Sequence, residues 1–399
     1  MAFLLTPVTG SGFIGRKELV SELVTELSSK NKIGFSLSGI RRIGKTSVLR
    51  EVERQLTSNH SMPVIYLSVW RISPATVDQF VRVLNHSTVS AFEDSLPAKF
   101  KFEELLTAGA GALGRLLRNL KLSAGVGKDL EVSVSYVRGE GEDAGDALSK
   151  SFSLVEDMAR MVNRQCVLVL DEFPSLTDLT YGTRNQKIGE SIIKLARTLY
   201  EEFEYTKLVV SGSYRGTLEN IVLKQRAPFY RQLLLRELKP FDESEYLQFL
   251  THYLQDLKFV GDAKGQLYNV TGGIPYSLQL LARQLTFKKI EELDTKQLNA
   301  VTKELLQSEG ELLFKEYVDV LSPSEVKVLR ALAKKPLARP SELASGQFMD
   351  ARTVASSLTR LQNEGIIRKE GRASYKFSDN LFAEWLRLSA LDSNSRFYM

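Results

Sequence analysis

The feature that most constrains the fold is a glycine-rich loop at residues 39–46. Gly39 and Gly44 are separated by four residues, and Lys45 and Thr46 follow directly. This spacing is typical of a phosphate-binding loop that joins a strand to a helix. Its glycines let successive backbone N–H groups converge on an anion, and the helix that begins at Lys45 adds its positive end. We expect the phosphates of a nucleotide to be bound by Gly39, Ile40, Arg41, Arg42, Ile43, Gly44, Lys45, Thr46 and Ser47.

Each polar side chain of the loop has a role in this chemistry. We expect Lys45 to reach the β- and γ-phosphates and the hydroxyl of Thr46 to coordinate Mg²⁺. A second motif supplies carboxylates: residues 166–170 form an apolar run that ends in Asp171 and Glu172. Such a run predicts a strand buried on both faces, and parallel sheets bind ligands at the carboxyl ends of their strands. Asp171 would hold Mg²⁺ through water, and Glu172 would act as general base on the attacking water.

Further candidates follow the next apolar stretch, residues 208–212. Ser211 and Ser213 are candidate sensors, because a hydroxyl there would hydrogen-bond the attacking water or the γ-phosphate. Arg231 is the preferred arginine for stabilising γ-phosphoryl charge, in its own chain or in a neighbouring subunit. The alternative for Arg231 is an ordinary solvated side chain.

Two segments outside the loop are expected beside the nucleotide. Phe13, Ile14, Gly15 and Arg16 shortly precede the loop, where a segment would lie over a bound adenine. Pro275 is favoured at a helix start and would bring the amino end of that helix towards the nucleotide.

The order of predicted elements divides the chain into three parts. Apolar strands alternate with amphipathic helices up to about residue 238, which predicts a parallel α/β sheet. Residues 75–150 read as a helical insert with a strand or hairpin near 128–138. We expect an α/β nucleotide-binding domain at 1–238, a helical lid at 239–320 and a separate domain at 321–399.

The last part predicts three helices and a two-stranded hairpin, the order of a winged helix-turn-helix. Residues 322–399 contain 13 Lys and Arg and eight Asp and Glu, so their net charge is +5. This equals the net charge of the whole chain. Two uses stay open: contact with duplex DNA, or contact with protein. The DNA contacts would come from Arg352, Ser356, Arg360, Arg368, Lys369 and Arg372.

Composition narrows the class of protein. The only cysteine, Cys166, lies in an apolar run, which excludes a disulfide framework and favours a reducing compartment. The three histidines are scattered, and no apolar run is long enough to span a membrane. We therefore expect a cytoplasmic protein without a membrane span or a Cys-based zinc site.

Taken together, these motifs resemble a known family. The segments at 13–16, 39–47, 170–173, 211–213 and 273–275 are similar to the archaeal-type P-loop ATPases of the STAND group, relatives of AAA+ proteins and of replication-origin initiators. The resemblance implies a sheet of order 5-1-4-3-2 with a helical lid and a C-terminal winged helix. It also implies a nucleotide sensor at Gly273 and Pro275.

This resemblance implies a function as well. It predicts an ATPase that uses ATP and Mg²⁺, hydrolyses slowly and changes its assembly state, as a homo-oligomer or with a protein client. The leading hypothesis is a switch in which the nucleotide, ATP or ADP, repositions the lid and the winged helix. The alternatives are a DNA-binding replication or transposition factor that uses ATP for assembly, and a signalling adaptor.

Overall fold

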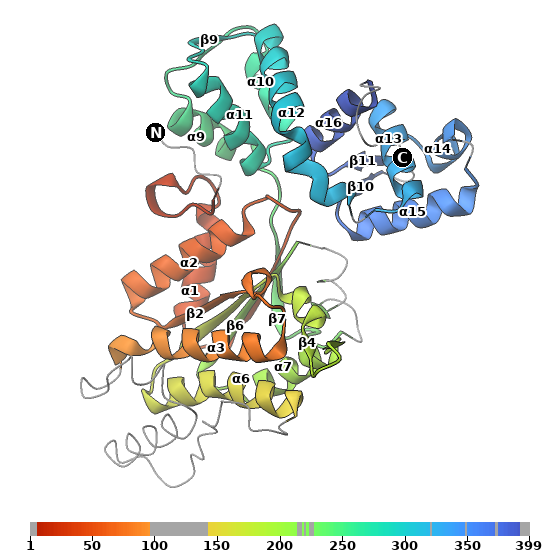
Figure 1. The fold of residues 1–399 in the computed structure, drawn as a ribbon. Helices are drawn as coiled ribbons and strands as arrows, with labels where there is room; N and C mark the ends of the chain where they lie inside the picture. Colours follow the sequence, from red (N-terminus) through yellow and green to blue (C-terminus); the bar gives the residue numbers. More distant parts are fainter. Residues whose placement is uncertain are drawn as a thin grey trace.

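The computed structural model describes residues 6–95, 143–213, 218, 221–222, 227–319, 321–347, 349–371 and 374–391. These residues form a sheet domain, a group of helices above it and a C-terminal unit beside that group (Figure 1). The predicted hairpin at 128–138, most of the predicted insert and Arg372 lie outside the described residues.

The sheet domain has five parallel strands: β1 (Gly34–Ser38), β2 (Val64–Ser68), β3 (Cys166–Asp171), β6 (Thr206–Gly212) and β7 (Leu233–Glu237). Their order is β2-β3-β6-β1-β7, and each neighbouring pair runs parallel. Counted along the chain this is the predicted order 5-1-4-3-2, read from the other edge. The expected α/β class and sheet order are confirmed.

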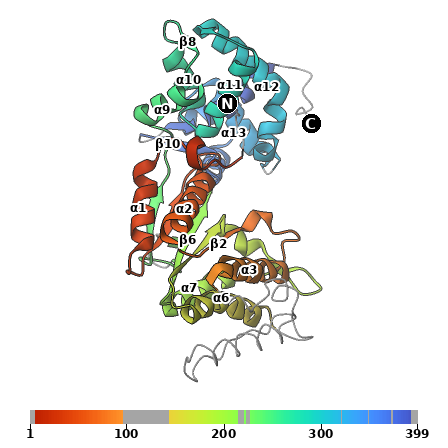
Figure 2. The same ribbon diagram turned by 90° about the vertical axis from the view of Figure 1, so that its left-hand side faces the viewer.

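Helices cover both faces of this sheet (Figure 2). One face packs against α1 (Lys17–Ser28) and α2 (Lys45–His60), and the other against α3 (Val77–Ala91), α6 (Ala144–Met161) and α7 (Ser191–Glu202). β3 shows why the sheet is buried on both sides: Val167 and Val169 belong to the first core, and Leu168 and Leu170 to the second. A short hairpin, β4 (Thr180–Tyr181) and β5 (Gln186–Lys187), follows β3.

The group of helices that we call the lid follows β7. It consists of α9 (Glu243–Tyr253), α10 (Ala263–Thr271), α11 (Pro275–Phe287) and α12 (Thr295–Val318). A two-residue parallel pair, β8 (Lys258–Phe259) and β9 (Glu292–Leu293), joins its outer end. Asp242 and Asp294 form capping boxes that fix where α9 and α12 begin.

The C-terminal unit contains α13 (Pro323–Lys334), α14 (Pro340–Gln347), α15 (Ala351–Asn363), an antiparallel pair β10 (Ile367–Glu370) and β11 (Ser374–Phe377), and α16 (Asn380–Leu391). The three helices α13 to α15 and the hairpin follow the predicted element order, and α16 is a further helix that was not predicted. The predicted cap at Ser322 is a capping box, and Asp350 caps α15.

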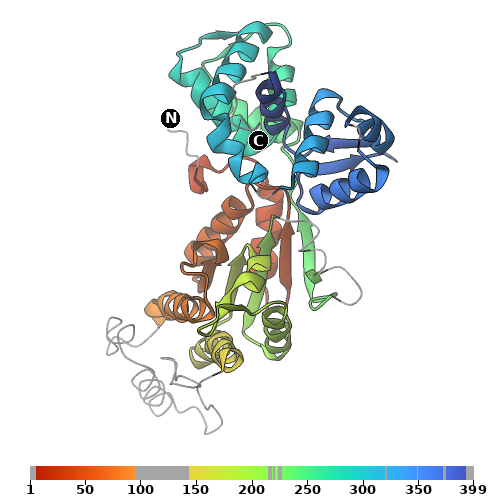
Figure 3. The same cartoon turned by 45° about the vertical axis from the view of Figure 1, so that its right-hand side comes forward.

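The lid and the C-terminal unit lie side by side (Figure 3), and one hydrophobic core runs from one into the other. Phe314 on α12 packs against Phe382 and Trp385 on α16, with ring centroids 5.3 and 5.7 Å apart. Gly310 makes this approach possible, because a Cβ there would lie 2.2 Å from Cδ1 of Trp385. The lid and the C-terminal unit are therefore packed together more closely than a boundary near residue 320 suggests. None of the helices in the described ranges is long and apolar enough to cross a bilayer.

Candidate nucleotide-binding site

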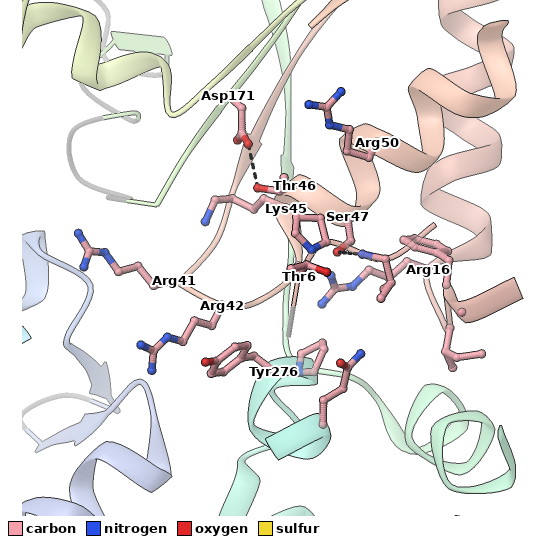
Figure 4. A pocket seen from close by; sticks show the side chains of 18 of the residues that line it. Thr6, Arg16, Arg41, Arg42, Lys45, Thr46, Ser47, Arg50, Asp171 and Tyr276 are labelled. Carbon is pink, nitrogen blue, oxygen red and sulfur yellow. Dashed lines mark hydrogen bonds between the residues drawn. The ribbon is translucent and has the colours of Figure 1, made fainter. Parts of the chain in front are cut away.

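A cavity of about 370 Å³ lies between the carboxyl edge of the sheet and the lid (Figure 4). Ligand sites commonly have this size. It is lined from the sheet domain by Phe13, Ile14, Arg16, Arg41, Arg42, Gly44, Lys45, Thr46, Ser47, Asp171, Glu172 and Ser213, and from the lid by Pro275 and Tyr276. Most of the predicted nucleotide residues thus meet in one cavity, although they come from distant parts of the sequence.

The glycine-rich loop has the backbone shape that the motif requires. Gly44 precedes α2 with a φ of +96°, a value that glycine adopts without steric cost. Ile43 is fully buried in the core beneath the loop, and Ile40 is half-buried and faces the C-terminal unit. The side chains of Ile40 and Ile43 therefore anchor the loop, while its backbone is left to face the cavity.

Lys45 is buried at the bottom of the cavity. Its ammonium donates hydrogen bonds to the carbonyls of Gly39 (3.0 Å) and Ile40 (3.1 Å) and to Oγ of Ser213 (2.8 Å). Burial lowers the pKa of Lys45 to about 8, although the charges of Glu172 and Asp171 act in the opposite direction. A phosphate placed here would restore the compensation that a buried ammonium needs.

Asp171 is held by three hydroxyl groups. Its Oδ2 accepts hydrogen bonds from Thr46 Oγ1 (2.8 Å) and from the hydroxyl of Tyr66 (2.7 Å), and its Oδ1 accepts one from Ser211. Oxygen ligands of this kind, a carboxylate and a threonine hydroxyl, suit Mg²⁺. Thr46 and Asp171 are thus the residues that would hold the metal.

Glu172 adopts a left-handed backbone conformation with a φ of +56°, which turns it out of β3. Ser213 bonds both oxygens of its carboxylate: the Ser213 N–H donates to Oε2 (3.0 Å) and its hydroxyl donates to Oε1. Ser213 therefore connects Glu172 to Lys45, while Ser211 connects Asp171 to the backbone N–H of Glu172 (3.2 Å). Ser211 and Ser213 are therefore hydrogen-bonded directly to the carboxylates of Asp171 and Glu172.

The segment before α1 closes one wall of the cavity. Arg16 is oriented by a hydrogen bond from its guanidinium to the Lys239 carbonyl (3.0 Å) and by a cation–π contact with Phe241 at 5.2 Å. Burial lowers the pKa of Arg16 to about 10, with Glu245 acting in the opposite direction. Its guanidinium also lies beside Gly44, where a Cβ would be 2.9 Å from Arg16 Nη1. Gly15 does not line the cavity; its positive φ of +73° makes the turn that positions Arg16.

Arg41 and Arg42 extend from the loop towards the lid and the C-terminal unit (Figure 4). Arg42 donates to the Leu313 carbonyl (2.6 Å) and stacks on Tyr276 at 4.8 Å. Arg41 lies 4.9 Å from the ring centroid of Trp70 and 5.5 Å from that of Tyr317. The two arginines thus attach the loop to its surroundings as well as lining the cavity.

Arg231 lies at the other edge of the sheet. β7 runs parallel to β1, with Leu233 beside Gly34 at the amino end and Glu237 beside Ser38 at the loop end. Because Arg231 precedes Leu233, it stands at the edge opposite the cavity, exposed and stacked on Tyr230 at 5.1 Å. It therefore does not reach the cavity of its own chain, and a role at a neighbouring subunit stays a prediction.

The described basic candidates of the C-terminal unit are all exposed. Arg352, Ser356 and Arg360 are spaced four residues apart on α15, which places them on one face. Arg368 and Lys369 are exposed on β10. Arg360 is also engaged by Glu325, with Nε 3.3 Å from Oε1.

Several cavity residues were not predicted from the sequence, among them Tyr66, Arg50 and Gln279. Arg50 follows Thr46 by one helical turn and lies 3.4 Å from the ring centroid of Tyr66. That spacing is visible in the sequence and would have pointed to Arg50. The places of Tyr66 and Gln279 depend on strand pairing and on lid packing, for which the sequence carries no local signal.

Comparison with known proteins places the chain in a family and shows related folds. The model of a family described as an ATPase domain predominantly from Archaea matches residues 13–281. An uncharacterised ATP-binding protein of Methanocaldococcus jannaschii is 20% identical over 300 residues, which is 74% of each chain. The Walker-type ATPase of Pyrococcus abyssi has a similar fold, with a TM-score of 0.67 at 20% identity over 97% of this chain and 100% of that one. The ORC2 protein of Aeropyrum pernix, solved in ADPNP and ADP complexes, gives a TM-score of 0.55 at 11% identity over 96% and 98%.

Proposed function

Since the chain belongs to the family of ATPase domains found predominantly in Archaea, we propose that it binds ATP with Mg²⁺, hydrolyses it and uses the nucleotide state to move its lid and C-terminal unit. The observation that carries this proposal is the hydrogen-bonded set around the cavity. Lys45, Thr46, Asp171 and Glu172 are joined directly or through Ser213. These are the residue types that phosphoryl transfer to water requires.

The roles follow from the contacts. Residues 39–47 would hold the phosphates, with Lys45 on the β- and γ-phosphates, and Thr46 and Asp171 would hold Mg²⁺, which neutralises phosphate charge. Glu172 would take a proton from the attacking water. In the structure Lys45 and Glu172 both bond Ser213. A γ-phosphate that took over the Lys45 ammonium would therefore loosen this arrangement and free Glu172 to act.

The proposed switch depends on contacts that connect the phosphate-binding loop to the lid and to the C-terminal unit. Arg42 is bound to α11 and α12. Ile40 and Arg41 share a small cavity with Ser378 and Asp379 of the C-terminal unit. A Cβ at Gly365, in the turn before β10, would lie 3.7 Å from the Ser213 carbonyl. Any shift of the loop or of Ser213 on nucleotide binding would be transmitted through these contacts to the lid and the C-terminal unit.

Two substitutions test the enzymatic part. Lys45→Ala is expected to abolish ATP–Mg²⁺ binding in calorimetry, because it removes the buried cation. Glu172→Gln is expected to retain binding and to lower phosphate release by about 100-fold or more, the usual contribution of a general base. Glu190→Gln, at an exposed position, is the matched control. An absence of ATP binding by the unmodified protein would overturn the proposal.

A second function is favoured by the exposed basic face of α15. Arg352, Ser356 and Arg360 would contact the groove of duplex DNA, with Arg368, Lys369 and Arg372 on its phosphates. Duplex binding should then weaken steeply with salt, and Arg352→Ala or Lys369→Ala should weaken it further. Lack of a salt-dependent shift on duplex DNA, together with an ATP-dependent change in oligomer size or a co-purified client, would favour a protein-binding role instead.

A further inference from the structure

The cavity has two chemically different halves. The half formed by the loop is cationic and rich in hydroxyls, with Arg16, Lys45, Thr46 and Ser47. The other half is built mostly of apolar and aromatic side chains: Pro7, Val8, Phe13, Ile14, Phe249 and Tyr253. Aromatic and aliphatic walls suit the faces of a planar base, and they offer nothing to its polar edge.

Gln279 is the exception in the apolar half. It lies one helical turn after Pro275 on α11, lines the cavity and is only 8% exposed. No hydrogen bond joins its amide to another residue in the described part of the chain. The nearby hydroxyl of Tyr253 is already engaged, because it donates to the Gly12 carbonyl (2.9 Å).

The amide of Gln279 faces the cavity and has no partner within the described part of the chain. An apolar residue would fill the same place on α11, and its neighbours Leu278 and Leu280 are buried leucines. The polar atoms of Gln279 therefore have no structural use within the described chain. Their position on the cavity wall indicates that a ligand supplies the missing partners.

We propose that Gln279 is a specificity-determining residue that reads the polar edge of the purine base. A glutamine amide offers one acceptor and two donors side by side, which complements adjacent amino and ring-nitrogen groups on adenine. With the phosphates on residues 39–47, the base would lie against the apolar lining residues and the lid, which contributes Gln279 from α11. This inference rests on the proposed function, since it assumes that a nucleotide occupies the cavity in that orientation.

The test compares Gln279→Leu with the unmodified protein by calorimetry. The probes are ATP, purine riboside triphosphate, which lacks the exocyclic amino group, and inorganic tripolyphosphate. We expect the unmodified protein to prefer ATP over purine riboside triphosphate by about tenfold, the worth of a buried hydrogen bond. The leucine variant should lose this preference and keep its affinity for tripolyphosphate.

Two controls make the outcome specific. Gln284→Leu changes a glutamine on the same helix that bonds Glu309 outside the cavity, and it should keep the preference for ATP. If the leucine variant does not fold, Gln279→Met keeps the length of the side chain but removes both the acceptor and the donors, and it should also reduce the preference. An unchanged preference in a folded variant, or an equal loss for both nucleotides, overturns the inference. Failure of the unmodified protein to bind either nucleotide or tripolyphosphate would instead overturn the proposed function.

Discussion

The hydroxyl of Tyr66 lies 2.7 Å from Oδ2 of Asp171, the same oxygen that accepts a hydrogen bond from Thr46. Tyr66 stands on β2 and Asp171 at the end of β3, and these strands are neighbours in the sheet. Burial, followed by the charge of Asp171, raises the pKa of Tyr66, so the phenol keeps its proton and remains a donor. Tyr66 is thereby placed to orient the carboxylate that would hold Mg²⁺.

Replacement of Tyr66 by Phe should therefore weaken the metal dependence of nucleotide binding. Loss of one hydrogen bond to a charged group predicts a rise of about tenfold in the Mg²⁺ concentration needed for half-maximal effect. The measurement is ADP affinity as a function of Mg²⁺, or of Mn²⁺ followed by electron paramagnetic resonance. Affinity for ADP in EDTA should not change. Tyr246→Phe, which removes a hydroxyl bonded to the Lys264 carbonyl in the lid, is the control. If Tyr66→Phe and Tyr246→Phe depend on the metal concentration equally, Tyr66 does not orient the metal-binding carboxylate and its role is structural.

The pH dependence of nucleotide binding should follow Lys45. Burial lowers its pKa to about 8, so the ammonium loses its proton as pH rises through that value. Phosphate binding requires the charged form, and affinity should therefore fall above pH 8, approaching about tenfold per pH unit. The linked effect on folding has the opposite sign: the unfolded chain holds more protons on Lys45 between pH 8 and 10.5, so this group makes unfolding less favourable as pH rises. Calorimetry from pH 6.5 to 9.5 in buffers of different ionisation enthalpy would detect the proton uptake on binding. An affinity independent of pH in this range would contradict it.

The sheet was predictable because its strands are marked by continuous apolar runs. Residues 166–171 are all buried, and a run of this kind has few alternatives to a central parallel strand.

The helices of the lid were harder to predict from the sequence. α10 spans nine residues and buries only Ala263, Leu267 and Thr271, so its pattern is weak. The longest lid helix, α12, runs from Thr295 to Val318 and contains Gly310 in its interior. A glycine is unfavourable inside a helix, and only the approach of Trp385 explains why it is there.

The residues of the site also fall into those that the sequence predicts and those that it does not. The loop, the two acids and the serines are close to a strand end, and the sequence alone placed them because parallel strands end at one edge. For Arg231, a role in its own chain, one of the two that were left open, did not take that rule into account, since a residue before a parallel strand stands at the opposite edge. Tyr66 and Gln279 could not be foreseen. Their function depends on which strands and helices become neighbours, and this is decided by packing over the whole domain.

A buried acid outside the site should control the stability of the sheet domain. Glu156 on α6 is 5% exposed and accepts hydrogen bonds from the backbone N–H groups of Glu204 (2.8 Å), Tyr205 (3.0 Å) and Thr206 (2.9 Å). These groups lead into β6, which begins at Thr206, contains Ser211 and ends at Gly212, directly before Ser213. Glu156→Ala leaves them without an acceptor and should lower the free energy of unfolding by about 3 kcal/mol. Urea unfolding would measure this, with Glu202→Ala at an exposed position of α7 as control. A loss below about 1 kcal/mol would mean that water replaces the carboxylate.

The last prediction concerns the route from the nucleotide to the C-terminal unit. The Arg42 guanidinium lies among Tyr276 of α11 and Phe314 and Tyr317 of α12, with ring centroids 4.8, 5.5 and 5.7 Å away, and donates to the Leu313 carbonyl. Because α12 shares a core with α16, a movement of the loop that shifts Arg42 should reach the C-terminal unit.

Arg42→Ala should therefore uncouple the two ends of the molecule. In the unmodified protein, replacing ADP by a non-hydrolysable ATP analogue is expected to change hydrogen exchange in α12 and α16. At saturating nucleotide the alanine variant should lose most of that change in hydrogen exchange, because the loop no longer contacts α11 and α12 through Arg42. Arg42→Lys keeps the charge but not the planar group that stacks on three rings, and it should restore only part of the response. If both variants respond to the analogue as the unmodified protein does, coupling must instead run through other contacts, either those of Ile40 and Arg41 with the C-terminal unit or the approach of Ser213 to the turn at Gly365.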